Sequence, residues 1–118
     1  MKSFIISCCT LLLVFTVIIL NYFYVLKICK YMIKEASETS VSDVNNATSL
    51  FEYWKKRRIY IALSVPHRVS DELEKNLLIF ISRAQEGTKS TFEESRNLLV
   101  NSIEEVKIHA GISADTVF

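Results

Sequence analysis

The chain has 118 residues, a formal net charge of +1, two glycines and one proline, and half of its residues are hydrophobic. This length holds one small domain. Residues 31–118 carry a net charge of −2, which excludes the basic footprint of a nucleic-acid-binding domain, so no nucleic acid is expected as a partner. The scarcity of glycine and proline, together with an apolar rhythm near 3.6 residues, predicts an all-α chain.

The first notable element is an apolar run of 24 residues, 3–26, bounded by Lys2 and Lys27. As a helix it would measure about 36 Å, and a bilayer core is roughly 30 Å thick. The sequence therefore predicts a transmembrane anchor with short flanks over residues 1–30, followed by a small helical domain over 31–118.

A cleavable signal peptide is the alternative for this run. Signal peptides have an apolar region of roughly 7–15 residues that ends in a small-x-small cleavage site. Here the run is longer and ends in residues 21–26, Asn-Tyr-Phe-Tyr-Val-Leu, which offer no such site. Tyr22, Phe23 and Tyr24 are typical of the aromatic belt at a membrane surface, so a retained anchor is favoured.

The flanking charges leave the orientation open. Lys2 precedes the run, and Lys27, Lys30 and Lys34 follow it, a slight excess that favours a cytoplasmic domain. A very short N-terminus before a long apolar run is also typical of a signal-anchor, which leaves the domain outside the cytoplasm.

All three cysteines, Cys8, Cys9 and Cys29, lie in or beside the apolar run. Residues 31–118 therefore have neither a disulfide nor a cysteine metal site, and no cofactor is expected.

Three helices are predicted after the anchor, as a three-helix antiparallel bundle or a helical hairpin domain. The first begins at Ser42 as N-cap and ends near Ser64, because Pro66 cannot continue it. The second covers about 68–85 and ends at Gly87 as a left-handed C-cap. The third opens with a capping box at 90–93, ends at 110–111, and leaves a short tail that packs back through Val117 and Phe118. Apolar residues at helical spacing give the expected core: Val44, Ala47, Phe51, Trp54, Ile61, Val65, Leu73, Leu77, Phe80, Ile81, Ala84, Phe92, Leu99, Ile103 and Val106.

Two segments of the domain carry a resemblance. Residues 51–58 read Phe-Glu-Tyr-Trp-Lys-Lys-Arg-Arg, and His67 is followed by 69–74, Val-Ser-Asp-Glu-Leu-Glu. With the apolar N-terminus, this layout resembles the short membrane-anchored bacterial proteins grouped as domain of unknown function 4363, found chiefly in Gram-positive spore formers. The resemblance covers nearly the whole chain. It implies a location in the bacterial envelope with the domain outside the cytoplasm, and no established activity.

The candidate contact residues lie around the basic run of the first domain helix. Tyr53, Lys55, Lys56, Arg57 and Tyr60 could contact a partner protein or anionic lipid headgroups. Four consecutive helical residues point in different directions, so a solvated surface is the simpler reading of the basic run. Trp54 falls on the apolar stripe and is expected in the core.

The two histidines give a further candidate site. In a hairpin that turns near Thr88, His67 would face His109 and Asp71 would face Glu105. Such a group could bind a zinc-like cation or respond to pH, although helix-end histidines are ordinarily solvated or capping groups.

No catalytic signature is present, so an enzyme is not expected: the sequence has no glycine-rich phosphate loop and no nucleophile elbow. The favoured function is a single-pass membrane-anchored interaction or accessory module that binds another membrane protein or itself. The alternative is a small sensor or ligand-binding module that uses the histidine end of the hairpin.

Overall fold

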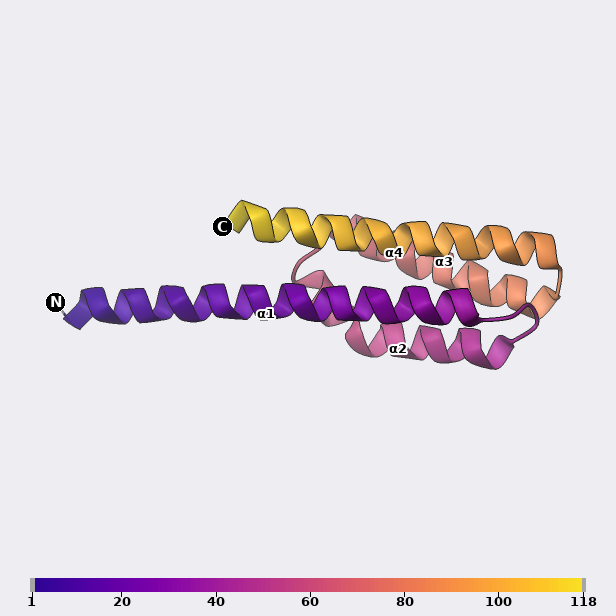
Figure 1. The fold of residues 1–118 in the computed structure, drawn as a ribbon, viewed down its shortest axis with the longest axis horizontal. Coiled ribbons are helices and arrows are strands. Elements are labelled where there is room, and N and C mark those ends of the chain that lie inside the picture. The colour runs from indigo at the N-terminus through magenta and orange to yellow at the C-terminus, as the bar shows by residue number, and fades with distance from the viewer. Residues whose placement is uncertain (1, 118) are drawn as a thin grey trace.

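The computed structural model describes residues 2–117, with side chains for residues 2–112, and consists of four helices (Figure 1). They are α1 (Lys2–Glu38), α2 (Val44–Ala62), α3 (His67–Glu86) and α4 (Lys89–Val117). Residues 2–117 contain no strand, which confirms the predicted all-α class.

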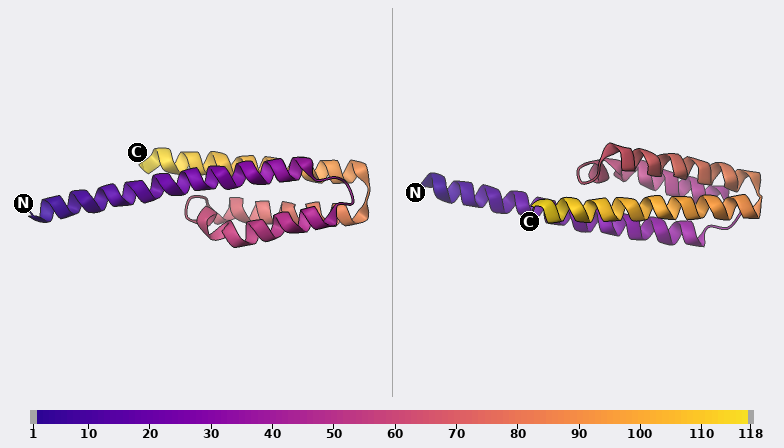
Figure 2. Two further views of the ribbon diagram at one scale, coloured as in Figure 1. Left: turned by 60° about the horizontal axis from the view of Figure 1, so that its bottom comes forward. Right: turned by 90° about the horizontal axis from the view of Figure 1, so that it is seen from above.

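Successive helices run in opposite directions and form an up-down-up-down bundle (Figure 2). Helices α1 and α3 each pack against α2 and α4, and short connections join neighbours, as in other antiparallel bundles. The molecule measures 67 × 21 × 19 Å because α1 projects far beyond the other helices. We expected three packed helices after the anchor; the structure adds the second half of α1 as a fourth.

Helix α1 has two halves with different surroundings. The side chains of residues 2–20 are exposed except for the half-buried Phe15 and Ile18, and this part is about 28 Å long at 1.5 Å per residue. By length and composition α1 could cross a membrane, and none of its most apolar 18-residue window is buried. From residue 25 onward an apolar stripe enters the bundle: Val25, Ile28, Cys29, Met32 and Ala36 are buried.

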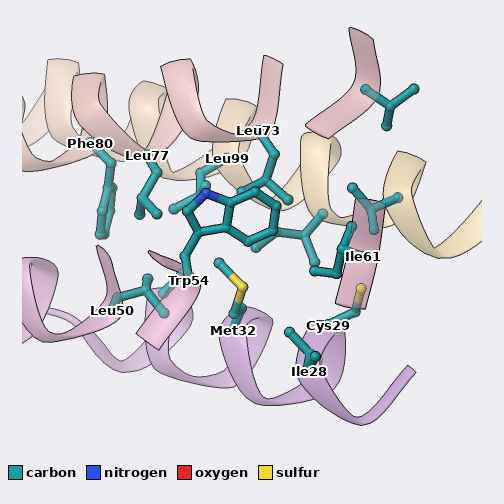
Figure 3. Close-up of a cluster of buried hydrophobic side chains, with 14 of the residues drawn as sticks. Ile28, Cys29, Met32, Leu50, Trp54, Ile61, Leu73, Leu77, Phe80 and Leu99 are labelled. Atoms are coloured by element: carbon teal, nitrogen blue, oxygen red, sulfur yellow. The ribbon is translucent and has the colours of Figure 1, made fainter. Parts of the chain in front are cut away.

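The core surrounds Trp54, which is fully buried at the centre of the bundle (Figure 3). Met32 of α1 lies on one side of the indole, while Leu73 and Leu77 of α3 and Leu99 of α4 lie on the other. Trp54 is therefore a core residue, as predicted. The other residues of the predicted core are buried as well, except Val44, Phe51 and Ile81, which are partly buried.

At the far side of the bundle, the cap of α2 differs from the sequence prediction. Asp43, and not Ser42, caps α2, with its carboxylate accepting from the backbone N–H of Asn46 at 3.2 Å. Ser42 instead takes a left-handed conformation, φ 74°, which lets the loop turn. Gly87 has φ 75° and ends α3, as predicted. The two loops meet here, because a Cβ on Gly87 would lie 3.0 Å from the Ser42 hydroxyl.

Helix α4 is longer at both ends than the sequence predicts. It begins at Lys89, so Ser90 lies inside the first turn and the predicted capping box is wrong. It also continues through Gly111 to Val117, so the predicted stop and tail are wrong. The chain has no proline here, and α1 offers a surface to pack on: Gly111 lies against Tyr22. The expected packing of the Val117 and Phe118 side chains falls outside the described residues.

Arg96 joins α4 to the end of α1 through hydrogen bonds. Its Nε donates to the Ala36 carbonyl at 3.0 Å, and a second guanidinium N–H donates to the Thr39 carbonyl. These carbonyls belong to the last turn of α1 and the residue after it, where helix carbonyls lack intrahelical donors and a cation is favourable. The guanidinium also lies over the Phe92 ring, 4.9 Å from its centroid.

Replacing Arg96 with Met should lower the free energy of unfolding by about 2–3 kcal/mol, because charged hydrogen bonds to partly buried carbonyls are lost. Arg83→Met is the matched control, since Arg83 makes an exposed ion pair with Glu86 and its removal should cost under about 1 kcal/mol. Thermal unfolding in detergent micelles measures both. Equal losses for the two variants would contradict the role given to Arg96.

Candidate functional site

Two tyrosine pairs join α1 to α2 along one face of the molecule. The rings of Tyr31 and Tyr53 lie 4.2 Å apart between centroids, and those of Tyr24 and Tyr60 lie 5.1 Å apart, edge to face. Within each helix the two tyrosines are seven residues apart, which is about two turns. The face therefore has an upper pair near the middle of the bundle and a lower pair where the bundle meets the exposed half of α1.

The upper pair carries a cation. The Arg57 guanidinium carbon lies 3.7 Å from the Tyr53 ring centroid, and Arg57 Nη1 donates to the Tyr53 carbonyl at 3.3 Å. Burial raises the pKa of Tyr53, while the positive charge of Arg57 opposes that rise. An open groove of about 340 Å³ runs beside this group, lined by Tyr31, Thr48, Ser49, Glu52, Tyr53, Lys56 and Arg57. Such a surface suits a carboxylate or aromatic side chain of a partner.

The four basic residues at positions 55–58 diverge. Lys55 lies over the Phe51 ring at 5.6 Å, Arg57 turns toward Tyr53, and Arg58 turns toward α3 to pair with Glu74 at 3.1 Å. Lys56 is exposed and lines the groove. The structure therefore brings Tyr53, Lys56 and Arg57 together and separates Lys55 from them.

The lower pair lines a different kind of surface. Tyr24 and Tyr60 contribute to an open, mainly apolar hollow of about 590 Å³, completed by Val17, Leu20, Asn21 and Leu63. The Asn21 amide is not left unpaired there, because it donates to the Ser64 hydroxyl and to the Tyr60 carbonyl. Tyr60 thus belongs with the apolar base of the bundle rather than with the basic residues.

The proposed histidine cluster does not form a metal site. Among the described side chains, those of residues 2–112, no three of His, Cys, Asp or Glu lie close enough to hold an ion. His67 and Asp71 share a surface hollow of about 370 Å³ with Arg58, Ile59, Ala62 and Ser70, so they face α2. Glu105 lines a small cavity of about 120 Å³ with Glu72 instead, and His109 is half-buried on α4.

The sequence pattern identified Tyr53, Lys56 and Arg57 around the upper pair. It did not identify Tyr31 of that pair or Tyr24 of the lower pair as site residues. Their signal was present as equal spacing, with Tyr24 and Tyr31 seven apart on one helix and Tyr53 and Tyr60 seven apart on the next. When two antiparallel helices pack in the matching register, residues spaced by seven on each helix face one another in pairs.

Comparison of the chain with protein-family models, with curated proteins and with solved structures found no match. The resemblance to domain of unknown function 4363 stays a prediction.

Glu74 of α3 accepts hydrogen bonds both from a core residue and from a surface residue of α2. Its Oε1 accepts from Trp54 Nε1 at 3.2 Å and from Arg58 at 3.1 Å. The indole N–H of the buried Trp54 can only donate, and the Glu74 carboxylate is the acceptor that it has.

Glu74→Ala should therefore lower the free energy of unfolding by about 2 kcal/mol, because it leaves the indole N–H without its acceptor. Glu74→Gln keeps a side-chain oxygen and loses only a partly exposed ion pair, so it should cost under about 1 kcal/mol. Unfolding followed by the fluorescence of Trp54, the sole tryptophan, measures both. A Gln variant as unstable as the Ala variant would show that charge, and not the indole hydrogen bond, matters here.

Proposed function

We propose that this chain is a single-pass membrane-anchored accessory module of the bacterial envelope that binds another membrane protein or a second copy of itself, without catalysing a reaction. The observation that carries the proposal is the unbroken α1, whose exposed apolar half continues directly into the bundle core. An exposed surface of large apolar side chains over residues 4–20 is unfavourable in water and favourable in a bilayer.

The same helix supports a retained anchor over a cleaved signal. The bundle uses α1 from Asn21 onward, through the hydrogen bonds of Asn21 and the contact of Tyr22 with Gly111. A cut after the apolar run would separate the lower tyrosine pair and remove Val25 from the core. The proposed anchor and the first helix of the bundle are thus two parts of α1, and the bundle uses residues that lie at the end of the apolar run.

The upper tyrosine pair and its groove are the proposed partner surface. Charge is distributed unevenly over the bundle: residues 27–62 carry a net charge of +3, while residues 67–117 carry −3. A basic face with exposed Tyr31 and Lys56 is complementary to an acidic partner or to the acidic side of a second copy.

The surface grooves of the bundle suit contact with a partner protein better than binding of a small molecule. The grooves described above are shallow surface features between helices, whereas small-molecule sites generally bury most of their ligand.

Protease added to intact cells should remove a tag fused after Phe118, because we propose that the domain lies outside the cytoplasm. The proposal rests on the signal-anchor layout and on the family resemblance. A cytoplasmic protein digested only after lysis is the control for intact cells. Protection of the tag in intact cells would reverse the orientation, and partners would then be sought in the cytoplasm.

A photo-crosslinking residue at Lys56 should give a discrete adduct in membranes, because this side chain is exposed beside the groove. The matched control is the same residue at Lys75, which is exposed on α3. An adduct of twice the chain mass would identify self-association, and a different mass would identify another protein. Absence of any adduct at Lys56, with the protein present in membranes, would contradict the proposed interaction surface.

A further inference from the structure

The base of the bundle, where α1 leaves it, is apolar on several helices. Besides the hollow formed by Val17, Leu20, Tyr24, Tyr60 and Leu63, large apolar side chains are exposed around it. Leu63 is 75% exposed at the end of α2, and the others at this end are Phe23, Ile59, Ile108 and Ile112. The lower part of the bundle therefore continues the apolar surface of residues 4–20 instead of ending it.

We propose that this end of the bundle, called the seat, is inserted into the membrane surface. The acyl chain of a bilayer phospholipid fills the hollow between α1 and α2. The inference rests on the proposed membrane anchor and adds where the domain sits on it. Val17 and Leu20 belong both to the exposed apolar half of α1 and to the hollow, so the hollow opens onto the same surroundings as that helix.

Cations lie one turn above the hollow, at the height that lipid phosphates would occupy. Lys27 lies between Tyr24 and Tyr31 along α1, and Arg57 lies between Tyr53 and Tyr60 along α2. Because the tyrosines are paired across the helices, these two cations are at the same level of the bundle. Lys and Arg at this level favour an anionic surface, and tyrosines are enriched where headgroups meet acyl chains.

The polar groups near the hollow are compatible with lipid. Among its lining residues, Asn21 donates to the Tyr60 carbonyl of α2 and to the hydroxyl of Ser64, two residues past the end of that helix, so little is lost when water leaves. Insertion is shallow, because Arg68 is exposed at the start of α3, at this end of the bundle, and a charged side chain is costly in hydrocarbon.

Nitroxide labels in the full chain, reconstituted into vesicles of phosphatidylcholine and phosphatidylglycerol, test the proposal. The background is Cys8→Ala with Cys9→Ala; Cys29 is retained, because it is only 1% exposed, and the unsubstituted background checks that it takes no label. Labels are placed at Leu63→Cys in the seat, at Leu12→Cys in the apolar half of α1, and at Leu78→Cys on α3. Leu78 is 50% exposed, about three turns from the start of α3, and serves as the aqueous control.

Each label is read by its collisions with oxygen, which concentrates in lipid, and with a nickel chelate, which stays in water. We expect oxygen collisions to dominate at positions 12 and 63 and nickel collisions to dominate at position 78. Tyr60→Cys gives a second reading of the seat, and should match position 63.

The other outcomes overturn the proposal in distinguishable ways. A lipid signal at 12 with a water signal at 63 removes the seat and leaves the anchor intact. A label at 63 shielded from both reagents means that a second copy covers the hollow, and lipid signals at both 63 and 78 mean that the bundle lies flat on the membrane. A water signal at 12 removes the anchor and the seat together.

Discussion

The continuity of α1 is the constraint on which the rest of the structure depends. One helix of 37 residues is exposed and apolar in its first half and packed in a core in its second. The second half supplies a stripe of five buried residues, so α2 and α4 have a surface to pack against and α3 closes the bundle opposite it. Burial of such a stripe provides most of the stability of bundle helices, which are marginal alone.

The two ends of the bundle are held together by different kinds of contact. The far end is polar and is held by specific hydrogen bonds: Arg96 donates to the end of α1, and the Asp43 carboxylate accepts from the first turn of α2. The near end is held by ring contacts and by Asn21, and exposes large apolar side chains. Hydrogen bonds hold one end of the bundle and large apolar side chains are exposed at the other, so the two ends differ in polarity along the long axis.

Much of the fold could be predicted from the periodicity of the sequence. Helices α2 and α3 have apolar residues at clear helical spacing, Pro66 separates them and Gly87 ends α3, so their existence and their buried faces followed from local rules. The packing of the second half of α1 was not predicted, although its buried residues follow helical spacing, because this half directly continues an apolar run that was assigned to the membrane. The extension of α4 past Gly111 was not predicted from the local sequence; there the helix lies beside Tyr22, a residue distant in sequence. The same reason explains the site: Tyr53 and Arg57 were recognisable on their own helix, whereas Tyr31 joins them only through the register of α1 against α2.

Because no break separates the exposed half of α1 from the bundle, the helix has no hinge at which the two parts could move independently. Arg96 and the tyrosine pairs fix α1 against α4 and α2 over the length of the bundle. A rotation of the apolar half about its own axis therefore turns the upper tyrosine pair to a new direction, and a tilt swings the far loops sideways. The direction of the bundle is therefore coupled to the direction of the apolar half of α1.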